Sequence, residues 1–161
     1  MSEAEVVLAA PTAADTRAVG VRLAGLTRAG DLLVLGGRLG AGKTTLTQGI
    51  GAGLGVRGEV TSPTFVIARV HRSLTGGPDL VHVDAYRLGD RVELDDLDLD
   101  ADVDHSVTVV EWGEQMAEPL AESLLRVRLE RPDPDAEDRV VRVQPLGPRW
   151  AAADVRASLL A

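Results

Sequence analysis

Short apolar runs alternate with amphipathic segments along this chain, and the two periods predict alternating strands and helices. Strand-like runs, apolar throughout or at every second position, occupy residues 6–9, 31–36, 66–70, 80–84, 107–111, 124–130 and 139–144. Thr-Gly-Gly-Pro at 75–78 and Pro-Asp-Pro-Asp at 132–135 each separate two such runs, which predicts two antiparallel hairpins, the second near a sheet edge. We therefore predict an α/β fold with a mixed, mostly parallel sheet flanked by helices, in one domain spanning residues 1–161.

Helical periodicity appears near both ends of the chain. Thr12 and Asp15 have the spacing of a capping box, so a helix is expected to begin there and to bury Val19, Leu23 and Leu26. A last helix is expected to start at Pro148. Its apolar face is predicted to consist of Trp150, Ala153, Ala157 and Leu160.

Residues 37–44 read Gly-Arg-Leu-Gly-Ala-Gly-Lys-Thr, the G-x-x-x-x-G-K-[ST] spacing of a phosphate-binding P-loop. The run at 31–36 predicts a strand before it, and apolar residues at i, i+4 and i+8 from Leu46 predict a helix after it. Glycines let backbone N–H groups approach phosphate oxygens, and the helix start adds unpaired N–H donors. In such a loop Lys43 reaches the β- and γ-phosphates and the Thr44 hydroxyl binds Mg²⁺. A glycine-rich turn that matches by chance is the alternative, against which the flanking strand and helix argue.

The helix after the P-loop contains an unusual number of glycines, Gly49, Gly51 and Gly53. Each costs about 1 kcal/mol relative to alanine in a helix interior. Their number predicts either close packing against a neighbouring element or a helix that frays early near Gly55.

A P-loop hydrolase also needs an acidic partner for the metal and a group that orients water. Asp84 and Glu111 each end an apolar run, and ligands of α/β sheets bind at the carboxyl ends of strands. The sequence leaves open which carboxylate contacts the metal. His82 shares a strand face with Asp84 and either orients that carboxylate or is a core histidine. Thr64, in Ser-Pro-Thr at 62–64, is a candidate γ-phosphate sensor, with a capped turn as the alternative.

Composition narrows the classes of function. The 161-residue chain has a formal net charge of −8, so it is not expected to hold nucleic acid by itself. It has no cysteine, which excludes disulfides and thiolate–metal sites, and no apolar run approaches membrane-spanning length. We expect a cytoplasmic protein. The chain also has no asparagine and hence no Asn-Lys-x-Asp guanine motif, which favours ATP over GTP.

These motifs together resemble the TsaE (YjeE) family, the small P-loop ATPases of bacterial tRNA threonylcarbamoyladenosine (t6A) synthesis. The matching stretches are Leu-Gly-Ala-Gly-Lys-Thr-Thr at 39–45, Ser-Pro-Thr-Phe at 62–65, His-x-Asp-x-Tyr-Arg-Leu at 82–88 and Glu-Trp at 111–112. Their order and separations fit the family pattern over essentially the whole chain. The P-loop alone is generic, whereas the combination is specific.

The resemblance implies ATP or ADP and Mg²⁺ as cofactors, and it implies a role for each matching residue. Lys43 binds phosphate, Thr44 and Glu111 coordinate Mg²⁺, Asp84 is needed for hydrolysis and Thr64 lies in a nucleotide-responsive switch. Asp84, Thr64 and Lys43 are thus the expected catalytic residues. The expected nucleotide-binding residues are Gly37, Leu39, Gly40, Ala41, Gly42, Lys43, Thr44 and Thr45, with Trp112 beside the site.

Members of the family hydrolyse ATP poorly alone and act with a complex of a TsaD-type transferase and its TsaB-type paralogue. The resemblance therefore implies that tRNA is met only indirectly, through that complex. Two residues depart from the family pattern. Arg38 stands where the family usually has an acid, which reverses a charge beside the phosphates, and Gly113 stands where proline commonly follows Glu-Trp.

Two other functions are compatible with the P-loop. A small-molecule kinase would need an arginine-rich lid and a second substrate pocket, and the sequence shows no clear lid. A nucleotide-sensing interaction module would bind ATP with negligible turnover. An acceptor-dependent ADP release assay separates the kinase from the ATPase, and single-turnover hydrolysis with and without the partner complex separates the sensing module.

Overall fold

The computed structural model describes residues 5–38, 40–58, 68–84, 104–111 and 122–160. Its strands are β1 (Val6–Ala10), β2 (Leu32–Gly36), β3 (Ala68–His71), β4 (Asp79–Asp84), β5 (Ser106–Glu111), β6 (Leu124–Glu130) and β7 (Arg139–Leu146). Its helices are α1 (Ala13–Leu26), α2 (Lys43–Leu54) and α4 (Ala152–Leu160). Every predicted strand is present, with its ends within about two residues of those expected from the apolar runs.

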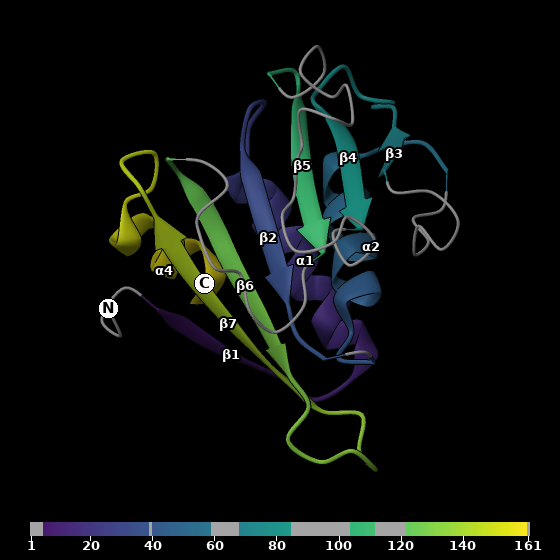
Figure 1. Cartoon of the computed structure of the whole chain (residues 1–161), viewed down its shortest axis with the longest axis vertical. Coiled ribbons are helices and arrows are strands. Elements are labelled where there is room, and N and C mark those ends of the chain that lie inside the picture. The colour runs from purple at the N-terminus through teal and green to yellow at the C-terminus, as the bar shows by residue number, and fades with distance from the viewer. Residues whose placement is uncertain (1–4, 39, 59–67, 85–103, 112–121, 161) are drawn as a thin grey trace.

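The strands form one sheet in the order β1-β7-β6-β2-β5-β4-β3 (Figure 1). The four strands β6, β2, β5 and β4 are mutually parallel. β3 pairs antiparallel with β4, and β7 pairs antiparallel with both β6 and β1. The mixed sheet and both hairpins are therefore confirmed. The second hairpin lies one strand in from the edge, because β1 pairs with the outer side of β7.

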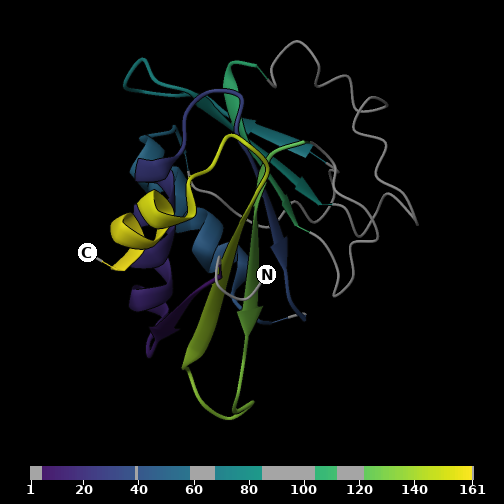
Figure 2. The ribbon, with the colours of Figure 1, turned by 90° about the vertical axis from the view of Figure 1, so that its left-hand side faces the viewer.

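All three described helices lie on one face of the sheet (Figure 2). They cover a core that includes Leu23 of α1, Leu33 of β2 and Leu46 of α2, each fully buried. Val34 of β2 and Val110 of β5 alternate with these core positions and are also buried, at 2% and 0% exposure. The central strands are thus buried on both faces, as is usual for parallel strands. None of the helices in the described ranges is long and apolar enough to cross a membrane.

The glycines of α2 let that helix pack closely against α1. A Cβ on Gly49 would meet the carbonyl oxygen of Arg17, and one on Gly53 would lie 2.6 Å from the Cβ of Ala24. On the facing side, a Cβ on Gly20 would lie 2.8 Å from the backbone nitrogen of Ile50. Of the two explanations for these glycines, the structure supports close helix packing.

The capping box at the start of α1 is confirmed. The backbone nitrogen of Asp15 donates to Thr12 Oγ1 at 3.2 Å, and the backbone nitrogen of Thr12 donates to Asp15 Oδ2 at 3.0 Å. Two orphan donors at the helix start are thereby satisfied.

The prediction for the last helix is wrong in both its start and its face. α4 begins at Ala152 rather than at Pro148, and the residues it buries are Val155 and Leu159. Of the face predicted from periodicity, Ala153 and Ala157 are exposed and Leu160 is 50% exposed. Alanine fits either face of a helix, so the position of the branched side chains decides which face is buried.

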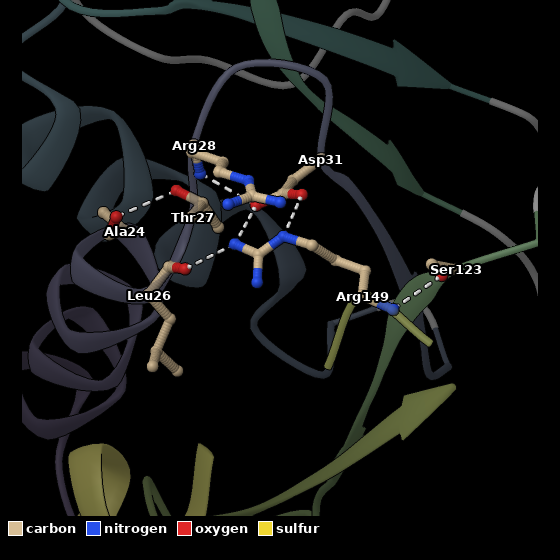
Figure 3. A network of polar contacts seen from close by, with 7 residues as sticks. All are labelled: Ala24, Leu26, Thr27, Arg28, Asp31, Ser123 and Arg149. Carbon is tan, nitrogen blue, oxygen red and sulfur yellow. Dashed lines mark hydrogen bonds and ion pairs between the residues drawn. The ribbon is translucent and has the colours of Figure 1, made fainter. Parts of the chain in front are cut away.

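Arg149, just before α4, ties this end of the chain to the start of β2 (Figure 3). Its Nε donates to Asp31 Oδ1 and its Nη2 to Asp31 Oδ2, both at 3.0 Å. Nη2 also donates to the carbonyl oxygen of Leu26 at 3.3 Å, and the backbone nitrogen of Arg28 donates to Asp31 Oδ2 at 2.8 Å. This network fixes the turn from α1 into β2, at the opposite end of β2 from the glycine loop.

Candidate functional site

The glycine loop connects the buried strand β2 to the start of α2, as predicted. Gly37, Gly40 and Gly42 have φ values of 146°, 81° and 105°, in the region that favours glycine. Space also selects glycine at position 37, where a Cβ would lie 2.8 Å from the carbonyl oxygen of Leu129. Gly42 is the N-cap of α2 and supplies no side-chain cap, so the first-turn amides of α2 have no acceptor from that residue. A loop of this shape before a helix start suits an anion.

Lys43 places its ammonium group over this loop. The side chain is buried, at 7% residue exposure, and Nζ donates to the carbonyl oxygen of Gly37 at 2.7 Å. Its first-turn neighbours Thr44 and Thr45 are half-buried, and Ala41 is 3% exposed. A phosphate entering the loop would meet the positive charge of Lys43 as well as the helix start.

The strands that carry the predicted carboxylates end beside β2. Glu111, the last residue of β5, is the register partner of Leu35 in β2 on one side and of Asp84 in β4 on the other. The two acidic positions and the start of the loop therefore lie at the same end of the sheet. Glu111 is 5% exposed, whereas the side chain of Asp84 lies outside the described part.

His82 is fully buried and contacts Glu111, which agrees with the alternative of a core histidine. That His82 orients Asp84 stays a prediction, because the side chain of Asp84 lies outside the described part. His82 Nε2 lies 2.8 Å from Glu111 Oε2, and the side-chain exposures are 0% and 7%. His82 Nδ1 is buried and has no hydrogen-bond partner among the described residues. The histidine of β4 thus orients the carboxylate of the neighbouring strand.

The donor set at this end of the sheet fits Mg²⁺. Glu111 would offer carboxylate oxygens and Thr44 a hydroxyl oxygen to such an ion, and these are the hard ligands that Mg²⁺ prefers. The described ranges contain no cluster of three or more His, Asp or Glu that would form an all-protein metal cage. Mg²⁺ is usually held in this way, by one or two protein groups together with substrate phosphates and water.

A cavity of about 580 Å³ opens beside the loop, and Arg38 is one of the residues that line it. Its lining consists of Gly37, Arg38, Ala41, Arg128, Leu129, Glu130, Arg131, Pro132 and Pro134. Arg38, which stands where the family usually has an acid, therefore adds a third arginine to a cavity wall that already contains Arg128 and Arg131. Glu130 in this wall is itself paired with Arg142, at 2.6 Å.

Several expected site residues lie outside the described ranges: Leu39, Thr64 and Trp112. Two residues near the loop had not been expected at all, Glu137 and Arg139. Glu137, in the turn between β6 and β7, accepts a hydrogen bond from the backbone nitrogen of Ala13 at 2.7 Å. Arg139 donates to the carbonyl oxygen of Ala41 at 3.0 Å, across 98 positions of sequence. No local spacing signals such a contact.

A sequence model of one family matches residues 10–141, and its description is "Threonylcarbamoyl adenosine biosynthesis protein TsaE". Relatives described as tRNA threonylcarbamoyladenosine biosynthesis protein TsaE are similar over most of their length. The protein of Streptomyces coelicolor is 63% identical over 142 residues, which cover 86% of this chain and 96% of the relative. That of Bacillus subtilis is 36% identical over 137 residues, covering 84% and 83%.

The fold is also found among solved structures. The crystal structure of Bacillus subtilis YdiB matches with a TM-score of 0.74 at 27% sequence identity, covering 97% of this chain and 94% of that one. The sequence match and the fold match thus agree over nearly the whole chain. This chain belongs to the TsaE family and, as such, has a role in threonylcarbamoyladenosine modification of tRNA.

Proposed function

We propose that this chain binds ATP with Mg²⁺ at the glycine loop and hydrolyses it in association with a complex of the TsaB–TsaD type. Hydrolysis supports the turnover of that complex during t6A modification. The observation that carries the proposal is the loop itself. Three glycines with positive φ lead into α2, and the ammonium group of Lys43 lies over them, 2.7 Å from the Gly37 carbonyl oxygen.

The role that we propose for each residue rests on the family resemblance and, for the described residues, on their position around the loop. The loop and first-turn residues hold the phosphates by their backbone N–H groups, and Lys43 adds a charge-assisted hydrogen bond. Thr44 and Glu111 hold Mg²⁺, which neutralises charge on the phosphates. Asp84, beside Glu111 in the sheet, orients the attacking water. For Thr64 and Trp112, which lie outside the described part, the family resemblance alone supports the proposal that Thr64 acts as the nucleotide-responsive switch and that Trp112 contributes to the nucleotide site.

The charge of the chain bears on its partners. A net charge of −8 opposes direct binding to the tRNA backbone, so the partner complex, rather than this chain, holds the tRNA. The chain then acts through protein contacts, and its place of work is the cytoplasm, where tRNA is modified.

Calorimetry with ADP and ATP, each with Mg²⁺, tests nucleotide binding. Lys43→Ala is expected to abolish tight binding, whereas Asp84→Ala is expected to keep binding and to lose ADP release in the presence of the partner complex. If Asp84→Ala lost affinity as severely as Lys43→Ala, the assignment of Asp84 to the hydrolytic step would be wrong. If the wild-type chain bound neither nucleotide, the proposed function itself would fail.

A further inference from the structure

One guanidinium group, that of Arg139 at the start of β7, touches the glycine loop from outside. Its Nε donates to the carbonyl oxygen of Ala41 at 3.0 Å, and its Nη2 to the carbonyl oxygen of Gly40 at 3.4 Å. These are adjacent residues of the loop, immediately before the N-cap Gly42. The loop therefore presents two backbone acceptors to Arg139.

The same guanidinium also closes the turn between β6 and β7. Its Nη1 donates to three successive carbonyl oxygens, those of Ala136, Glu137 and Asp138, at 3.1, 2.7 and 3.0 Å. The acceptors of Arg139 in the described turn and loop are thus all backbone carbonyls. A planar fork of five donors can join two backbone segments in this way, whereas a lysine ammonium cannot span both.

A second contact fixes the turn to the helix that packs on α2. Glu137 Oε1 accepts from the backbone nitrogen of Ala13, the first residue of α1, at 2.7 Å. α1 in turn packs on α2 through Gly20 and Gly49, with no room for a Cβ at either position. The β6–β7 turn, α1 and α2 are therefore connected to one another and to the glycine loop.

The geometry of the peptide bond shows what Arg139 does to the loop. In a planar trans peptide the C=O of one residue and the N–H of the next point in opposite directions. By holding the carbonyl of Ala41, Arg139 directs the N–H of Gly42 away from itself. The carbonyl of Gly40 and the N–H of Ala41 belong to one peptide unit, and this N–H donates to the carbonyl oxygen of Arg38 at 3.0 Å. By holding the Gly40 carbonyl, Arg139 therefore fixes the plane of that unit as well.

We propose that Arg139 is a positioning residue of the nucleotide site: it fixes the peptide planes of Gly40 and Ala41 so that the loop is preformed for a nucleoside diphosphate or triphosphate. It also makes the position of the loop depend on the β6–β7 turn. The inference rests on the proposed function for the identity of the anion, whereas the hydrogen bonds of Arg139 to the loop and the turn do not depend on that function. Hydrogen bonds that involve a charged group are strong enough for their loss to weaken phosphate binding roughly 10-fold to 100-fold.

The test compares Arg139→Gln and Arg139→Lys with a matched control, Arg142→Gln. Arg142 lies three residues along the same strand and donates to the carboxylates of Glu130 and Glu5, at 2.6 and 3.1 Å, neither of which belongs to the glycine loop. Two quantities are measured on the full chain: the Kd of Mg-ADP by calorimetry, and amide hydrogen exchange of the peptide covering 38–45 in the nucleotide-free protein. Arg139→Gln is expected to bind Mg-ADP at least 10-fold more weakly and to exchange faster in that peptide alone. For Arg139→Lys, both the Kd and the exchange rate should lie between those of the wild type and of Arg139→Gln. For Arg142→Gln, both should match the wild type within about twofold.

Exchange distinguishes a positioning role from a general loss of stability, because general destabilisation would raise exchange in the core strands as well. The proposal is overturned if Arg139→Gln binds Mg-ADP like the wild type, or if faster exchange is spread over the sheet. Should Arg139→Gln fail to fold, the same comparison is made with Arg139→Lys, for which wild-type affinity and wild-type loop exchange overturn it. If the wild-type chain bound no nucleotide, the proposed function would fail, while the exchange comparison would still test whether Arg139 fixes the loop.

Discussion

His82 and Glu111 form a buried pair across the adjacent strands β4 and β5, with 2.8 Å between Nε2 and Oε2. When Nε2 carries the ring hydrogen, His82 donates to this carboxylate oxygen. This bond fixes one oxygen of Glu111 and therefore the rotation of the whole carboxylate. If Glu111 holds Mg²⁺ as proposed, losing the partner that orients it is expected to cost about 10-fold to 100-fold in metal affinity.

Replacing His82 is therefore expected to weaken the effect of Mg²⁺ on nucleotide binding. His82→Leu removes the donor and should reduce the enhancement of ADP affinity by Mg²⁺ roughly 10-fold. His82→Gln retains an N–H donor and should keep most of the enhancement. The measurement is the ratio of the ADP dissociation constants with Mg²⁺ and with EDTA.

His71→Leu is the matched control, because His71 is also a buried strand histidine, at 6% exposure, but its Nε2 has no hydrogen-bond partner within the described part of the chain. It should leave the Mg²⁺ effect unchanged. Equal Mg²⁺ enhancement in His82→Leu and in the wild type would show that Glu111 is oriented without His82.

The sequence predicted those parts of the structure that depend on neighbouring residues. The order of strand, glycine loop and helix around Lys43 follows from periodicity and from glycines at fixed spacing. The capping box of Thr12 and Asp15 and the β3–β4 hairpin are equally local, since each depends on residues within a few positions of a turn or a helix start. The ends of β4 and β5 came together because parallel strands share a carboxyl edge.

Contacts between distant residues could not be predicted from the sequence. Ala41 and Arg139 are 98 positions apart, and His82 and Glu111 are 29 positions apart. Strand register decides such contacts, and single-sequence patterns do not give register between strands that are not consecutive. The face of α4 was predicted wrongly for a different reason: an alanine-rich helix of 9 residues offers more than one apolar stripe.

The close contact of α1 and α2 predicts very different effects for two glycine substitutions. Gly49→Ala places a Cβ against the carbonyl oxygen of Arg17, so the helices must separate, at a cost of about 1–3 kcal/mol in the free energy of unfolding. Gly25→Ala, in α1, meets no atom within 4 Å and should be neutral or stabilise by up to about 1 kcal/mol. Urea unfolding of both variants measures the difference. A Gly49→Ala protein as stable as the wild type would mean that the helices can separate at little cost.

Burial of His71 predicts a loss of stability in mild acid. Desolvation lowers the pKa of His71 below its ordinary value of 6.5, and the nearby His82 also lowers it. As the pH falls below about 6.5, the unfolded chain therefore binds a proton at this position before the folded chain does. The free energy of unfolding then falls with pH, by at most about 1.4 kcal/mol per pH unit for one such group.

His71→Leu removes this contribution. Between pH 7.5 and pH 5.5 it should lose less stability than the wild type, as measured by urea unfolding at each pH. Other acidic and basic groups titrate in both proteins, so the comparison between them isolates His71. An equal loss in the two proteins would show that protonation of His71 does not contribute to the acid sensitivity.

The Arg149–Asp31 pair predicts a stability effect that leaves the nucleotide site intact. Both carboxylate oxygens of Asp31 accept from Arg149, and the side-chain exposures are 23% for the arginine and 6% for the aspartate. Arg149→Ala leaves the buried carboxylate without this donor, which should cost about 2–4 kcal/mol in the free energy of unfolding. The pair Arg72–Asp79 is the control, because it has the same 3.0 Å separation but its arginine is 67% exposed. Arg72→Ala should cost less than about 1 kcal/mol.

Because the Arg149 network lies at the opposite end of β2 from the glycine loop, the Kd for Mg-ADP should be unchanged in both variants at a temperature where both are folded. A weaker Kd in Arg149→Ala alone would mean that β2 transmits displacement along its length to the loop.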